Sequence, residues 1–84
     1  MDVKVRLFAG LKELVGGPDI VVQLSEGATV ADLEDQLGRD YPRLKPLLGS
    51  LAFAVGEEYK DREHVLHEND EIALIPPISG GDDV

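Results

Sequence analysis

Few residues of this 84-residue chain are of types that could do chemistry on their own. Cysteine is absent, which excludes a disulfide framework, a thiolate nucleophile and a thiolate zinc site. His64 and His67 are three residues apart beside acidic residues, but histidines in so charged a segment face solvent more often than they bind a metal. Ser25, Ser50 and Ser79 have no histidine and acid at spacings typical of a catalytic triad. The side chains therefore do not indicate an enzyme that acts alone.

The C-terminal stretch, residues 74–84, is the remaining candidate. An apolar segment leads into Pro76-Pro77, then Gly80-Gly81, then an acidic extension at residues 82–84. Proline has no backbone N–H and a fixed φ, so the double proline ends strand pairing and favours an extended chain. Glycines suit a thin tail that threads into another protein, and residues 78–81 span at most about 14 Å at roughly 3.5 Å per residue. A frayed end is the alternative.

The strands that must position this tail follow from the hydrophobic pattern. Alternating apolar residues predict strands at residues 3–8 and 20–24, which pair antiparallel across a turn. Residues 51–55 are apolar on both faces and predict a third strand, while the charged residues 57–63 predict a short edge segment. Residues 71–75 are nearly all apolar, which is typical of a central strand.

One long helix is predicted after the second strand. Thr29 is placed to cap it by accepting from the N–H of Asp32, and Pro42 disfavours its continuation. A shorter helical turn is expected at residues 10–16, closed by glycine. The long helix carries an apolar stripe with members three and four residues apart: Val30, Leu33, Leu37 and Tyr41.

These elements predict an α+β domain in which one main helix packs across one face of a mixed sheet of four to five strands. If the last strand lies parallel to the first, the arrangement is the ubiquitin-like β-grasp, and the C-terminus leaves the sheet centre as a free tail. Phe8 stands on the otherwise charged face of the first strand. It is either a contact with the local helix or an exposed docking residue.

The charge balance excludes two classes of partner. Seventeen acidic and eight basic residues give a net charge of -9, which repels nucleic acid and anionic membranes. No apolar run approaches the roughly 20 residues that span a bilayer, and no secretory segment follows Met1. The expected location is the cytoplasm.

Taken together, these segments resemble the small, sulfur-carrying subunits of molybdopterin synthase. These belong to the MoaD/ThiS group of ubiquitin-like sulfur carriers, which includes the thiazole-pathway carrier and the archaeal ubiquitin-like modifiers. The resemblance covers residues 2–81 and is carried by residues 5–14, 26–33 and above all 69–81. A terminal strand, double proline and diglycine in that order are closer to the molybdopterin branch than to the thiazole branch.

The resemblance implies a β-grasp domain at residues 1–77, a diglycine tail at 78–81 and an extension at 82–84 that is removed by a peptidase. Until cleavage before Asp82, the Gly81 carbonyl is locked in a peptide bond. The freed carboxylate would be adenylated by an E1-like adenylyltransferase that uses ATP, and then converted to a thiocarboxylate. It would donate sulfur to a pterin precursor in the large synthase subunit. The chain itself would be a non-catalytic subunit without a bound cofactor or metal.

The same resemblance implies a set of partner-binding residues. Two small chains would dock at the ends of a dimer of large subunits, with Gly80 and Gly81 in a narrow tunnel that admits no β-carbon. An apolar patch would contact the large subunit, with Lys12 at its rim. The patch consists of Phe8, Ile75, Pro76 and Pro77, and the partner-binding residues also include Ile78 and Ser79.

Three other functions stay open because they use the same tail or no tail chemistry at all. The chain could be a protein modifier joined through Gly81 to lysines of its targets. It could carry sulfur for thiazole, thiolated tRNA or cysteine. It could also be a binding module whose acidic end is never cleaved.

Overall fold

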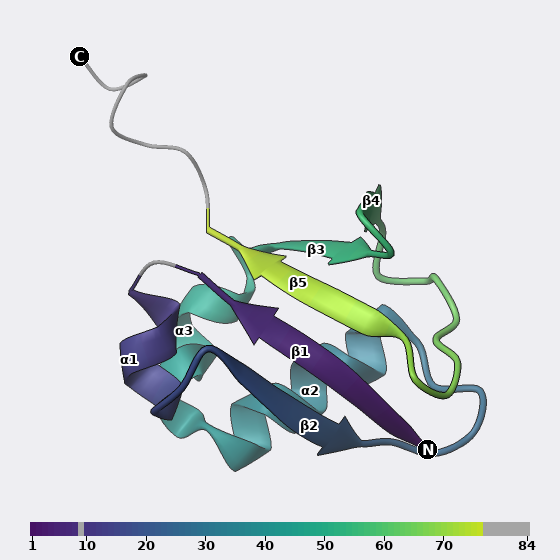
Figure 1. Cartoon of the computed structure of the whole chain (residues 1–84), viewed down its shortest axis with the longest axis horizontal. Coiled ribbons are helices and arrows are strands. Elements are labelled where there is room, and N and C mark those ends of the chain that lie inside the picture. The colour runs from purple at the N-terminus through teal and green to yellow at the C-terminus, as the bar shows by residue number, and fades with distance from the viewer. Residues whose placement is uncertain (9, 77–84) are drawn as a thin grey trace.

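Five strands form one mixed sheet in the order β2-β1-β5-β3-β4 (Figure 1). The computed structural model describes residues 1–8 and 10–76. Central β5 is parallel to β1 and antiparallel to β3, and β2 and β4 are antiparallel edge strands. This confirms the predicted β-grasp fold. The strands are β1 (Asp2–Leu7), β2 (Asp19–Gln23), β3 (Ala52–Val55), β4 (Glu58–Lys60) and β5 (Glu71–Ile75).

The main helix, α2 (Val30–Asp40), packs across one face of this sheet, and shorter helices lie at the end where β1 finishes (Figure 1). The shorter ones are α1 (Leu11–Val15), η1 (Pro42–Leu44) and α3 (Lys45–Leu48). The segment after Tyr41, where Pro42 was predicted to end the long helix, is thus itself largely helical. Within the described ranges, no helix has the length and apolar character needed to cross a membrane.

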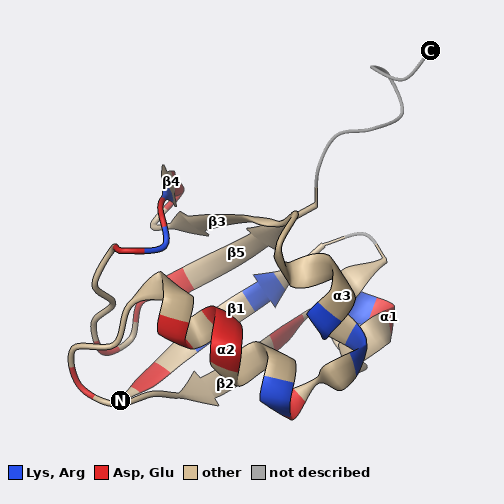
Figure 2. Ribbon diagram, turned by 180° about the vertical axis from the view of Figure 1, so that it is seen from behind, with Lys and Arg blue, Asp and Glu red and all other residues tan. Residues whose placement is uncertain are grey.

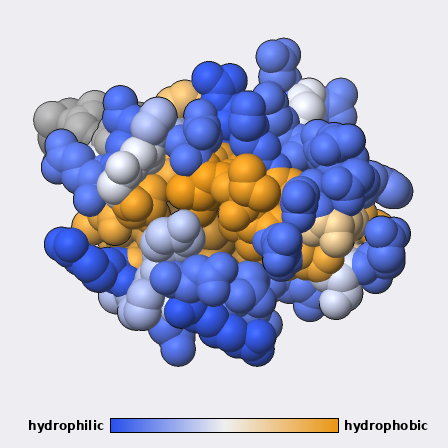
Figure 3. All heavy atoms as spheres, turned by 60° about the horizontal axis from the view of Figure 1, so that its bottom comes forward, coloured by the Kyte–Doolittle hydropathy of each residue, from blue (hydrophilic) through white to orange (hydrophobic). Residues whose placement is uncertain are grey.

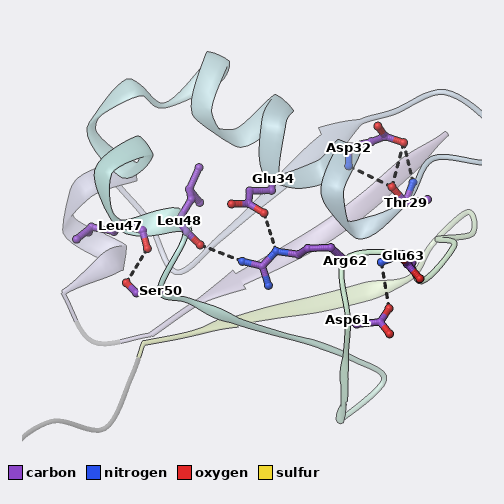
Figure 4. Close-up of polar contacts among 9 residues, drawn as sticks. All are labelled: Thr29, Asp32, Glu34, Leu47, Leu48, Ser50, Asp61, Arg62 and Glu63. Carbon is purple, nitrogen blue, oxygen red and sulfur yellow. Dashed lines mark hydrogen bonds and ion pairs between the residues drawn. The ribbon is translucent and has the colours of Figure 1, made fainter.

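The start of α2 is fixed by the predicted cap. Thr29 Oγ1 accepts from the Asp32 backbone N–H at 3.3 Å, and Asp32 Oδ2 accepts from the Thr29 N–H at 2.9 Å (Figure 4). This reciprocal pair satisfies two N–H groups that the first helical turn leaves without partners. The cap therefore orients the stripe of Val30, Leu33 and Leu37, all fully buried, toward the sheet.

Arg62 joins the connection between β4 and β5 to the helical layer. Its Nε donates to Glu34 Oε1 at 2.6 Å, and its Nη2 donates to the Leu48 carbonyl at 3.2 Å (Figure 4). The guanidinium carbon also lies 4.5 Å from the centroid of the buried Phe53 ring. One side chain thus contacts α2, α3 and the core side of β3.

Replacing Arg62 with alanine is expected to lower the free energy of unfolding by about 1–2 kcal/mol, because a partly exposed ion pair and a cation–π contact each contribute about 1 kcal/mol or less. Arg62→Lys keeps the charge but loses the planar fork, so its loss should be smaller. Thermal unfolding followed by circular dichroism measures both, at about 4–8 °C per kcal/mol for a domain of this size. Equal stability of the wild-type and alanine proteins would contradict this role.

Candidate functional site

The chain leaves the fold at the centre of the sheet. Central β5 ends at Ile75 between β1 and β3, and Pro76 follows it, half-buried. The residues expected to thread into a partner and react lie outside the described residues: Pro77, Ile78, Ser79, Gly80, Gly81 and Asp82. The structure therefore gives the point from which the tail starts and the surface around that point.

That surface is the face of the sheet turned away from α2, called the open face below. Side chains alternate between the faces of a strand, and the buried residues of β1 and β5 point toward α2. Cross-strand pairing then places one row across the open face: Arg6, Ala73, Ala54 and Tyr59. Two alanines in the middle of this row make a low floor between larger side chains.

Phe8 and Ile75 stand at the end of the open face nearest the tail. They follow Leu7 and Leu74, which form the last pair between β1 and β5 and have buried side chains. By alternation both project from the open face. Phe8 is 44% exposed. Its backbone carbonyl accepts a hydrogen bond of 3.1 Å from the N–H of Leu11, the first residue of α1. Its backbone thus contacts the local helix while its ring remains available to a partner.

A hollow of about 410 Å³ lies beside Phe8 on the open face. Its floor is apolar and its rim is charged, with Arg6, Glu57 and Glu71. Ala54 in this floor is only 5% exposed, although no described helix covers this face. A side chain of moderate size from a partner could enter the hollow. The lining residues are Arg6, Phe8, Ala54, Gly56, Glu57, Glu71, Ile72 and Ala73.

Tyr59 is a surface residue that sequence reasoning missed. It lies on edge strand β4, is 70% exposed, and pairs with Ala54, so it borders the same alanine floor. Most of residues 57–63 are charged, which indicates an exposed edge but not an aromatic contact surface. Alternation within Glu58-Tyr59-Lys60 could have found it, because it turns Tyr59 to the face opposite both charged neighbours.

Lys12, His64 and His67 do not line the hollow on the open face. Lys12 is exposed on α1, beside the buried Leu11 that anchors the helix. His67 Nδ1 is 3.9 Å from Asp70 Oδ2 in an exposed turn. Across residues 1–8 and 10–76, no group of three or more histidines and acids is placed to hold a metal ion. What the described residues bring together is an exposed, partly apolar surface beside Ile75 and Pro76.

The chain is similar in sequence and in fold to proteins that are already known. The molybdopterin synthase sulfur carrier subunit of Arabidopsis thaliana is 37% identical over 81 residues, which cover 96% of this chain and 84% of that protein. The small archaeal modifier protein 1 of Methanosarcina acetivorans has a TM-score of 0.81 and 31% identity, covering 95% of this chain and 96% of that one. A complex of subunits 1 and 2 of the molybdopterin-converting factor of Helicobacter pylori matches at TM-score 0.72 and 28% identity, over 96% of this chain and 100% of the matched one. Residues 5–81 match the model of the ThiS family, and the chain belongs to that family.

Proposed function

We propose that this chain is the sulfur carrier subunit of a molybdopterin synthase. The observation that carries the proposal is the position of β5, which brings the chain to Pro76 at the sheet centre, next to the exposed Phe8. A tail that starts there leaves from the same end of the open face as Phe8 and Ile75. The name of the Arabidopsis relative, which is similar over nearly the whole chain, supports the same function.

In this proposal the chemistry takes place at Gly81. A peptidase first removes residues 82–84. The Gly81 carboxylate then attacks the α-phosphate of ATP on an E1-like adenylyltransferase and displaces pyrophosphate. The acyl-adenylate is a far better electrophile than the carboxylate, so a sulfide equivalent can displace AMP and leave a thiocarboxylate. Gly80 and Gly81 have no β-carbon to obstruct this attack. ATP is used by the activating enzyme, and the carrier holds no cofactor of its own.

The open face is the proposed contact with the large catalytic subunit. Phe8, Ile75 and Tyr59 supply apolar area around the tail exit, and the small Ala54 and Ala73 allow close approach. The Helicobacter pylori complex of two converting-factor subunits supports a partner of this kind. A net charge of -9 would also speed association with a basic groove.

A protein modifier is the second candidate, favoured by the similarity to small archaeal modifier protein 1. It would use the same Gly81 carboxylate but would transfer it to a lysine amine, forming an isopeptide bond. A ladder of conjugates in extracts of the protein's own cells would indicate this function. Co-purification with a large synthase subunit would indicate the first.

The mass of the C-terminus tests the proposal directly. Protein isolated from its own cells together with its partner is expected to end at Gly81. Part of it should be heavier by the difference between one sulfur and one oxygen atom. If cells that make molybdenum cofactor contain only the chain with its extension intact and unmodified, the carrier function is wrong.

A further inference from the structure

At the β2 edge of the sheet, the outward backbone groups have no hydrogen-bond partner among residues 1–8 and 10–76. Beyond the two ends of β2, Met1 and Leu24 exchange hydrogen bonds of 2.6 and 2.8 Å, and the Pro18 carbonyl accepts from Leu7 at 2.8 Å. In an antiparallel ladder alternate residues bond to the neighbour, so Ile20 and Val22 bond to β1. The intervening residues Asp19, Val21 and Gln23 therefore point their N–H and C=O groups away from the sheet.

The two edges of the sheet differ in how they are protected. Edge strand β4 has three residues, two of them charged and joined by a Lys60–Glu58 ion pair of 3.1 Å. β2 has five residues, of which only Asp19 at its start is charged, and its central Val21 is 63% exposed. Charges, prolines and short length are the usual means of keeping an edge from pairing. The β2 edge is thus the less protected of the two and the one more open to pairing with a further strand.

An apolar band accompanies this edge. Figure 3 views the molecule from the side at the bottom of Figure 1, where β2 and α2 run, and the band lies between hydrophilic margins. On the core side of β2, Ile20 and Leu24 are only partly buried against the core. A strand added to β2 would cover these side chains as well as satisfy the backbone.

We propose that β2 pairs antiparallel with β2 of a second copy of this chain, with Val21 opposite Val21 of the partner subunit. The register is self-complementary, as a two-fold axis requires. It places Asp19 opposite the partner's Gln23, so that a carboxylate faces an amide and not another carboxylate. On the core side, Ile20 meets the partner's Val22. Every outward N–H and C=O of Asp19, Val21 and Gln23 then gains a hydrogen-bond partner.

Local charge permits this contact although each chain carries -9. On the open face next to the edge, Asp19 is the cross-strand partner of Arg6, and Lys4 follows Asp2 on the same face of β1, so two basic residues offset the two acidic ones. Charges farther apart than the Debye length of about 8 Å are largely screened at physiological salt. The hollow beside Leu24 at the end of β2 is lined by the acidic side chains of Glu26, Asp32 and Asp35 and by Arg39, and α2 carries both signs of charge (Figure 2). Repulsion from these nearby groups weakens the dimer, whereas the more distant acidic residues are largely screened.

The dimer is expected to be weak and to leave the docking face free. Pairing of five residues on each chain, with part of the apolar band, buries less accessible surface than a stable interface, which buries about 1,200–2,000 Å² in total. β5, where the tail begins, lies two strands from β2 in the sheet, so both copies keep their exits. The inference does not rest on the proposed sulfur chemistry.

Sedimentation of the full chain from about 10 µM to about 1 mM tests the proposal. The wild-type protein should shift from monomer to dimer over this range. Val21→Lys should weaken association at least tenfold through repulsion at the two-fold axis. Val21→Pro should do the same, because it removes an outward N–H that β1 does not use. The matched control Val65→Lys, also an exposed valine but away from β2, should associate as the wild type does.

Amide exchange supplies a readout that does not depend on the variants folding. The Val21 amide of the wild-type protein should exchange more slowly as concentration rises, while the exposed Glu63 amide should not change. A chain that stays monomeric at every concentration overturns the proposal. So does a dimer that persists in both Val21 variants, or a Val21 amide that is protected only by another protein's strand.

Discussion

A chain that keeps residues 82–84 is expected to give no acyl-adenylate with its activating enzyme, whereas the chain ending at Gly81 is activated. The reason is chemical and steric together. In the longer chain the Gly81 carbonyl is an amide, which does not attack the α-phosphate of ATP, and Asp82 and Asp83 add charged side chains to a tail that must enter a narrow site. Exchange of labelled pyrophosphate into ATP, with both chains at equal concentration, measures the difference. We expect the exchange rate with the longer chain to fall to the background rate measured without any carrier.

Two controls separate activation from folding. A chain ending at Gly80 has a free carboxylate one residue short and should also be inactive, because the reacting carbon no longer reaches the nucleotide. All three chains should unfold at the same temperature, since every buried residue of the described core precedes Pro76. Exchange at equal rates with the longest and the Gly81-terminated chains would refute the proposed need for processing.

The fold was largely predictable because its signals are local. Period-two alternation in β1 and the Thr29–Asp32 capping box are readable within a few residues, and both are confirmed. Asn69 has a φ of 70°, a left-handed backbone that asparagine tolerates better than most residues do. The central place of β5 followed from its continuous apolar run, which suits a strand with neighbours on both sides.

The helical turns at η1 and α3 escaped prediction because two prolines in seven residues suggest a break. Each proline lies at the start of a short turn, where its missing N–H costs no hydrogen bond. Leu44 and Leu48 are buried, whereas Leu47 is exposed. The phase of so short a helix depends on what it packs against, which periodicity over four residues does not define.

The candidate site was only partly predictable because it depends on strand register. Phe8 is conspicuous in sequence as an aromatic on a charged face. Tyr59 becomes part of the candidate site only because strand pairing places it beside Ala54. That pairing needs the tight turn at Gly56-Glu57, where both residues have positive φ, 58° and 72°. Glutamate seldom adopts this conformation, so sequence alone does not indicate a two-residue turn there.

Phe8→Glu and Tyr59→Glu are each expected to weaken binding to the large subunit by about 2 kcal/mol or more, roughly 30-fold, as for aromatic anchors buried in an interface. Both rings are exposed in the free chain, at 44% and 70%, so neither change should lower the unfolding temperature appreciably. Val65→Glu is the matched control, because Val65 has the same exposed fraction as Phe8 and lies in the bridge to Thr29, away from the open face. Isothermal titration calorimetry with the purified large subunit gives the three affinities.

The double variant decides whether the two rings contact one surface. Phe8 and Tyr59 border the same floor of Ala54 and Ala73, so a partner seated there touches both. Energies of residues that share contacts do not add, whereas those of independent sites do. The double variant should therefore lose less than the sum of the single losses. Ile75→Glu, beside Phe8 at the exit, should weaken binding in the same way. If Phe8→Glu and Tyr59→Glu both leave the affinity at the level of Val65→Glu, the large subunit binds elsewhere, because no partner could cover the open face and tolerate two buried carboxylates.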